Sequence, residues 1–265
     1  MQNLSKSAFT LAEGATHVVN WDNSRKIAFT LAEVLITLGI IGVVAAMTLP
    51  TLIQNYQKFV TVNRLKKEYS VISNAFVTSQ EENGEMNTWG MGNLGNTNDG
   101  TKVLIPFYQN YIVKYLDVVD DCGFNCIKQK HVKHYRLNGE TWNWYGDAWY
   151  IIYLKDGAVI AFMTDNNSVI WTTVRIYVDI NGDRGPNVSG KDIFTILLAT
   201  NGDSALKLSG ITTIRATKNR NTLLGNCHEC CSKKVTSTGS HSYAGDFCAG
   251  LIQYDGWKIS KDYPW

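Results

Sequence analysis

The stretch AFTLAEVLITLGIIGVVAAMTLPTLI, residues 28–53, decides the architecture of this chain. From Val34 to Ile53 it carries no charged side chain, and the next charged residue is Lys58. At about 1.5 Å per residue, a helix of roughly 20 residues spans the ~30 Å hydrocarbon core of a bilayer. We therefore expect residues 29–53 to form one transmembrane helix.

The hexapeptide AFTLAE of residues 28–33 also occurs earlier, at residues 8–13. The first copy is followed by the polar, turn-forming residues 14–22, which would not enter a bilayer. The second copy opens the apolar helix, so we expect it to be the functional one. We interpret the first copy as a relic of a duplicated leader.

Arg25 and Lys26 precede the apolar stretch, which favours a cytoplasmic N-terminal flank and export of the rest of the chain. A conventional signal peptide would instead have a small-x-small cleavage site after the apolar run. Here the run passes through Ala45 and Ala46 into a charged amphipathic segment without a polar break. The sequence thus gives little support for cleavage after the apolar run.

A basic residue, a small residue, the motif Phe-Thr-Leu-x-Glu and an unbroken apolar helix together resemble the class III prepilin signal of type IV pilins and type II secretion pseudopilins. The resemblance implies that a prepilin peptidase cuts between Ala28 and Phe29 and methylates the amine of Phe29. It places Glu33 at the acidic position of the family and Pro50 at the helix-bending proline. Two departures are Ala28, where the family usually has glycine, and a leader of 28 residues, which is longer than most.

Glu33 also has a physical reason to need a partner. A carboxylate at the edge of an apolar helix costs a few kcal/mol unless it is paired. In a filament, the amine of a neighbouring subunit's Phe29 would neutralise Glu33 and set the axial register. The alternative is an interfacial glutamate that extends to the lipid headgroups, and the flanking motif favours the pairing role.

The predicted organisation has four parts: a leader (1–28), a transmembrane helix (29–53), its amphipathic continuation (54–84) and an exported head (85–265). Beyond Pro50, apolar residues recur at three- and four-residue steps, which predicts one buried helix face, and Glu81–Gly84 is typical of a helix end.

The head shows helix and strand patterns. We expect a short helix near 103–115, a hairpin of strands 148–154 and 158–163, strands at 168–180 and 193–199, and a final strand at 250–254. The expected fold class is α+β, with the long helix packed against an antiparallel β-sheet of about four strands, as in pilins.

Residues 179–192 contain a candidate calcium site. Asp179, Asn181 and Asp183 place oxygen-bearing side chains at alternate positions, as in the first half of an EF-hand loop. The twelfth position is Gly190 instead of glutamate, so the loop is not an EF-hand, and Asp192 would close a different oxygen cage for Ca²⁺. The loop is similar in logic to the calcium-binding loops of pseudopilin heads. The alternative is a polar hairpin loop that uses these residues for their turn geometry.

All six cysteines lie in the predicted head, at Cys122, Cys126, Cys227, Cys230, Cys231 and Cys248. An even number in an exported domain predicts disulfides. Cys122 and Cys126 would close a small loop, whereas the sequence leaves the pairing of the other four open. Zinc bound by Cys122, Cys126, His131 and His134 is the alternative, which an exported location disfavours.

No phosphate loop, dinucleotide fingerprint or nucleophile elbow is present in the sequence, so we expect no enzymatic activity. The formal net charge of +2 does not indicate a specific nucleic-acid partner. The tryptophan-rich residues 141–145 predict sheet packing more strongly than a surface that stacks on sugars or bases.

We therefore interpret the chain as a structural subunit of a type IV pilus-like filament or a type II secretion pseudopilus. It would reside in the bacterial inner membrane, with a cytoplasmic N-terminus and a periplasmic or extracellular head. Its partners would be other pilin or pseudopilin subunits, the prepilin peptidase and the inner-membrane assembly machinery. The alternative is an exported binding or enzymatic domain that uses the helix only as an anchor.

Overall fold

The computed structural model describes residues 30–89, 101–146, 148–168, 171–199, 210–212, 219–235 and 243–265. The leader, both residues of the predicted cleavage site and the first AFTLAE copy lie outside the described residues. The chain forms two compact units that meet between Thr51 and Leu52. This boundary lies two residues before the predicted change from transmembrane to amphipathic helix.

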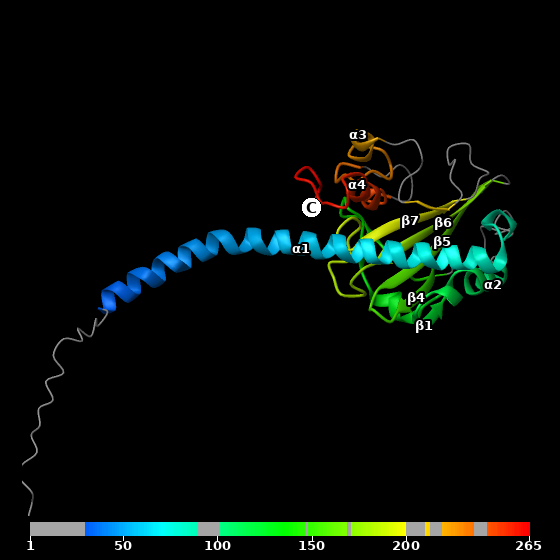
Figure 1. The fold of residues 1–265 in the computed structure, drawn as a ribbon, viewed down its shortest axis with the longest axis horizontal. Helices are drawn as coiled ribbons and strands as arrows, with labels where there is room; N and C mark the ends of the chain where they lie inside the picture. The colour runs from blue at the N-terminus through cyan, green and yellow to red at the C-terminus, as the bar shows by residue number, and fades with distance from the viewer. Residues whose placement is uncertain are drawn as a thin grey trace, which may run out of the picture. The chain divides into compact units, whose positions relative to one another are not determined.

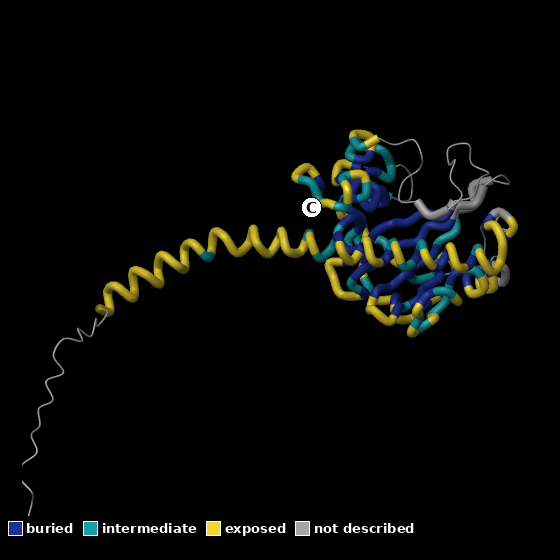
Figure 2. The backbone as a smooth tube through the Cα atoms, viewed as in Figure 1, coloured by how far each residue is buried: buried dark blue, intermediate teal, exposed yellow. Residues whose placement is uncertain are grey.

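Helix α1 (Leu31–Asn83) supplies the described part of the first unit and continues into the second (Figure 1). Its N-terminal part meets the length and hydropathy required to cross a bilayer, and none of that apolar window is buried within the protein. Figure 2 shows this part of α1 exposed almost throughout. A helix with apolar residues exposed on every side is typical of a membrane span.

From Val62 onward, one face of α1 is buried in the second unit. The buried residues recur at three- and four-residue steps: Val62, Leu65, Glu68, Ile72, Ala75, Phe76 and Ser79. The helix ends at Asn83, and Gly84 follows with a φ of 78°, a left-handed conformation that glycine adopts without a Cβ clash. The predicted helix end is confirmed. The predicted buried face is confirmed from Val62 onward but not before it, because Tyr56 and Phe59 are exposed.

A six-stranded antiparallel sheet forms the centre of the second unit, with strand order β1-β4-β5-β6-β7-β8. Its strands are β1 (Val118–Gly123), β4 (Tyr150–Leu154), β5 (Val159–Ser168), β6 (Trp171–Asp179), β7 (Ile193–Ala199) and β8 (Gly210–Thr212). A separate two-stranded sheet pairs β2 (His134–Tyr135) with β3 (Thr141–Trp142). The predicted hairpin, the next two strands and the antiparallel α+β layout are confirmed. The expected number of about four strands is wrong, because β1 and β8 pair with the two edges of this set and make six.

The short helices of the described residues are η1 (Met86–Thr88), α2 (Thr101–Tyr111), η3 (Val113–Tyr115), η4 (Ile127–His131), α3 (Arg220–Leu223) and α4 (Cys248–Tyr254). Helix α2 and η3 confirm the helix expected near residues 103–115. The final strand expected at 250–254 is wrong, because these residues belong to α4. Phe247 and Leu251 carbonyls accept helical hydrogen bonds from Leu251 and Asp255, and Leu251 and Ile252 are buried in the main core.

Alternating strand residues place two hydrophobic cores on opposite faces of the sheet. On one face, Ile152, Ile160 and Ile176 pack in the core that also contains the buried residues of α1 and α4. On the other face, Ile151 and Tyr177 pack with a cluster of aromatic residues that includes Trp142, Trp144 and Trp149. The tryptophan-rich segment thus packs against the sheet, as its alternating pattern predicted.

Candidate functional site

The second AFTLAE copy forms a reciprocal cap at the start of α1. The backbone N–H and the hydroxyl of Thr30 donate to Glu33 Oε2 at 2.8 and 2.9 Å, and the Glu33 N–H donates to Thr30 Oγ1 at 3.2 Å. This is the capping box expected of Thr-x-x-Glu at a helix N-terminus. The spacing is visible in the sequence, but both sequence-based interpretations of Glu33, a partner in another subunit or an interfacial position, leave out Thr30.

The cap fixes the environment of the Glu33 carboxylate in the single subunit. The carboxylate lies in the first turn of α1, where the helix dipole favours a negative charge. Its pairing with a neighbouring Phe29 amine stays a prediction, because that contact belongs to an assembly. Pro50 lies inside α1, directly before the boundary of the two units.

The loop between β6 and β7 brings Asp179, Asn181 and Asp192 together. Asp179 Oδ1 accepts the N–H of Asn181 at 3.1 Å, and the Asn181 side-chain amide donates to Asp192 Oδ2 at 3.4 Å. Asp192 also accepts the backbone N–H groups of Asn187 and Val188 at 2.8 and 2.6 Å. Burial raises the pKa of Asp179 to about 9, with the neighbouring Asp192 charge adding to the shift, and burial also raises the pKa of Asp192.

Three buried oxygens of this loop have no hydrogen-bond donor among the described residues: Asp179 Oδ2, Asn181 Oδ1 and Asn187 Oδ1. Buried carboxylate and amide oxygens without donors are costly, and a hard cation is the partner that such oxygens favour. Sequence reasoning missed Asn187, which adopts a left-handed φ of 52° that its local sequence does not reveal.

Asp183 is directed elsewhere in the structure. Its carboxylate accepts hydrogen bonds from the Gln129 side-chain amide at 2.6 Å and from the Tyr153 hydroxyl at 3.2 Å. The described residues contain no group of three or more His, Cys, Asp or Glu side chains placed to hold a metal ion. Any cation in this loop would therefore rely on two carboxylates, Asp179 and Asp192, together with neutral amide oxygens.

The six cysteines form three disulfides: Cys122–Cys126, Cys227–Cys230 and Cys231–Cys248. The predicted small loop between Cys122 and Cys126 is confirmed, and the structure supplies the pairing that the sequence left open. Disulfide sulfurs do not ligate zinc as thiolates do, so the zinc alternative with His131 and His134 is wrong. Burial lowers the pKa of His134 to about 4, with Arg136 as the second cause, so this imidazole is neutral at physiological pH.

Two family models match the chain. Residues 23–49 match the prokaryotic N-terminal methylation motif, which covers the predicted cleavage site, Glu33 and most of the apolar helix. Residues 51–265 match a family of unknown function, DUF6613. No curated protein and no solved structure matches the chain.

The methylation motif identifies the N-terminus as the prepilin-type signal of a type IV pilin-like or pseudopilin precursor, attached to a membrane by α1. The match to DUF6613 covers more than half of the chain and includes the whole sheet. The chain therefore belongs to the family DUF6613 and carries a prepilin-type methylation motif at its N-terminus.

Proposed function

We propose that this protein is a structural subunit of a type IV pilus-like filament or a type II secretion pseudopilus. In this proposal a prepilin peptidase cuts between Ala28 and Phe29 and methylates Phe29, and the head lies on the exported side of the inner membrane. The observation that carries the proposal is the methylation motif at residues 23–49, continuous with an exposed apolar helix. The disulfides suit an exported, oxidising location.

Assembly would exchange the partner of Glu33. In the single subunit, its carboxylate caps the subunit's own helix through Thr30. In the filament, the methylated amine of a neighbouring Phe29 would pair with the same carboxylate and fix the axial position of each subunit. The capping box would hold Glu33 at the helix end until that amine arrives.

A pair of substitutions separates the cap from the charge. E33Q keeps a side-chain oxygen for the capping box but removes the charge, whereas E33A removes both. Because an unpaired charge in an apolar bundle costs a few kcal/mol, we expect both variants to lower the sheared filament fraction by at least about tenfold. If E33Q gave the wild-type filament yield and E33A did not, the capping box without the charge would be sufficient for assembly. This result would contradict the pairing of Glu33 with Phe29.

We further propose that the loop of residues 179–192 binds Ca²⁺. Asp179, Asn181, Asn187 and Asp192 would supply the protein oxygens, while Asp183 would remain with Gln129 and Tyr153. The three donor-less buried oxygens of the loop support this proposal. The ion would lock the β6–β7 connection, which rests against α1 through the hydrogen bond from Thr61 Oγ1 to the Lys191 carbonyl at 3.5 Å.

A further inference from the structure

A pocket of about 360 Å³ lies where α1 meets the β6–β7 loop and the last residue of the chain. Its helix side is formed by Tyr56, Val60 and Arg64, and its other walls include Lys191 and Trp265. All of these residues belong to the second unit. The proposed assembly signal and the calcium loop's own oxygens do not account for this combination of basic and aromatic side chains.

The pocket is bordered by positive charge. Arg64 is exposed and Lys191 is half-buried, and both line the pocket directly. The Lys58 ammonium lies 5.8 Å from the centre of the Trp265 ring and adds a third cation beside the opening. The one acidic lining residue, Asp192, is buried, accepts two backbone N–H groups and is also one of the proposed calcium ligands. The site therefore favours an anionic group.

The Tyr56 wall of this pocket lies just beyond the end of the apolar run. The apolar run ends at Ile53, and Tyr56 follows three residues later, which is about 4.5 Å along the helix. Tyr56 and Phe59 are 67% and 65% exposed, as expected for aromatic residues at a membrane interface.

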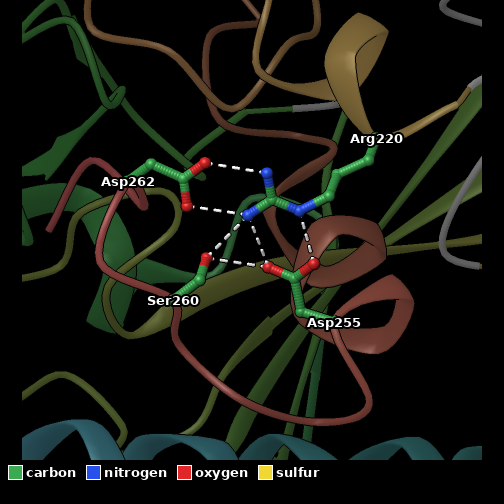
Figure 3. Close-up of polar contacts among 4 residues, drawn as sticks. All are labelled: Arg220, Asp255, Ser260 and Asp262. Atoms are coloured by element: carbon green, nitrogen blue, oxygen red, sulfur yellow. Dashed lines mark hydrogen bonds and ion pairs between the residues drawn. The ribbon is translucent and has the colours of Figure 1, made fainter.

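The C-terminal segment that carries Trp265 is held firmly against the head. Figure 3 shows Arg220 between Asp255 and Asp262. The Arg220 guanidinium donates four hydrogen bonds of 2.6–2.9 Å to the two carboxylates. The Tyr263 hydroxyl donates to the Gly190 carbonyl, and Lys233 Nζ donates to the Trp265 carbonyl at 3.1 Å. The aromatic wall of the pocket is therefore built into the fold.

We propose that this pocket binds the phosphate of an anionic phospholipid headgroup on the exported face of the membrane. Arg64 and Lys191 would bind the phosphate, with Lys58 beside them, and Tyr56 and Trp265 would pack against the glycerol and the upper acyl chains. The proposal rests on the proposed function only for its topology. Lipid held here would retain the subunit in the membrane before extraction into a filament.

Native mass spectrometry of the full-length chain in mild detergent tests the proposal. The probes are phosphatidylglycerol and phosphatidylcholine with identical acyl chains, in buffer with EDTA so that Ca²⁺ does not bridge to the lipid. We expect selective retention of phosphatidylglycerol. Because each basic residue near such a surface contributes about fivefold in affinity, R64Q and K191Q should each lower that retention by roughly this factor.

Lys66 supplies the matched control on the same helix. It is exposed, it lies two residues from Arg64 and it therefore points to the opposite side of α1. K66Q should retain phosphatidylglycerol like the wild type, and thermal melting checks that each variant is folded. Equal retention of the two lipids, or equal losses for R64Q and K66Q, would overturn the proposal.

Two other results would assign the pocket to a different occupant and so overturn the lipid proposal. Displacement of the lipid by millimolar inorganic phosphate would indicate a site for a free anion. If the wild-type chain formed dimers without retained lipid, and R64Q abolished these dimers, the pocket would be a surface for a second copy of the chain. The intact mass in the same spectrum shows whether the leader has been cut, so failure of lipid binding and failure of the pilin proposal are read separately.

Discussion

Glu68 is a buried carboxyl where α1 meets the turn between β4 and β5. It is 3% exposed, and its Oε1 lies 3.6 Å from the Lys67 ammonium, which also forms a salt bridge with Asp156 of the turn. Burial raises the pKa of Glu68 to about 7, and the nearby Asp156 adds to the increase. Glu68 therefore holds its proton in the folded chain at pH values where an unfolded chain has released it.

The sign of the pH dependence follows from this raised pKa. Between an ordinary pKa near 4.5 and the folded value near 7, the folded state binds more protons than the unfolded state, so Glu68 makes stability fall as pH rises. E68Q changes the free energy of unfolding, and we expect this change to be more stabilising at pH 8 than at pH 5 by about 1–3 kcal/mol. Urea unfolding at both pH values measures this difference.

Glu81 gives a matched control, since it is an exposed glutamate on the same helix. E81Q should change the free energy of unfolding equally at pH 5 and pH 8. An E68Q effect that is also the same at both pH values would contradict a buried, protonated Glu68 at the junction of α1 and the β4–β5 turn.

The proposed calcium loop makes a second prediction at the residue scale. Millimolar Ca²⁺ should raise the free energy of unfolding by about 1–3 kcal/mol over EDTA, as for an extracellular site of modest affinity. D179N should abolish this increase, because Asp179 supplies the buried carboxylate with a donor-less oxygen. D183N should retain it, because Asp183 contacts Gln129 and Tyr153. The reverse order of the two variants would refute the proposed ligand set.

At the scale of elements, Asp246 joins three parts of the head. It precedes α4, and its carboxylate accepts hydrogen bonds from Arg136 after β2 at 2.8 Å and from Arg175 and Tyr177 of β6 at 2.9 and 3.0 Å. Asp246 is 1% exposed, and both arginines are about 5% exposed. Removal of one partner from such a network leaves the other charges buried without compensation.

We expect D246A to lower the free energy of unfolding by about 3–5 kcal/mol. D262A is the control, because it removes a carboxylate from the more exposed pair with Arg220 and should change stability far less. Denaturant unfolding of the two variants under one set of conditions makes the comparison. Equal effects would show that the Asp246 network does not contribute more than a surface pair.

Much of the element order could be predicted because its signals are local. The apolar run, the helix end at Gly84 and the β4–β5 hairpin each follow from the pattern of a few neighbouring residues. Strand β1 has the sequence VVDDCG, and its two adjacent aspartates do not predict a strand. It forms because it pairs with β4, a contact that the local sequence does not reveal. The short apolar run at residues 250–254 fits a strand as well as a helix, and packing against the sheet and the Cys231–Cys248 disulfide decide in favour of α4.

The candidate sites also divide into those with a local sequence signal and those that depend on distant contacts. Thr30 and Glu33 are local, and their spacing alone predicts the capping box. Asn187 and the redirected Asp183 depend on how the loop turns and on the distant Gln129, so the sequence does not reveal them. The pocket beside Trp265 is still less accessible to sequence reasoning, because it joins residues separated by most of the chain.

At the scale of the whole molecule, the two family models divide the chain almost where its two structural units meet. The methylation motif covers residues 23–49, the DUF6613 match begins at residue 51, and the units meet between residues 51 and 52. A prepilin-type membrane segment is thus joined to a six-stranded head with three disulfides. The proposed role as a filament subunit depends on how the cell processes the first of these parts.

The most direct test is the N-terminus and intact mass of the mature protein, isolated from cells with and without their prepilin peptidase. We predict a chain that begins with N-methylated Phe29 in the first cells and an uncut leader in the second. A chain that begins at Phe9 would assign the signal to the first AFTLAE copy. A start beyond Ala46, or processing that does not depend on the peptidase, would contradict a role as a filament subunit.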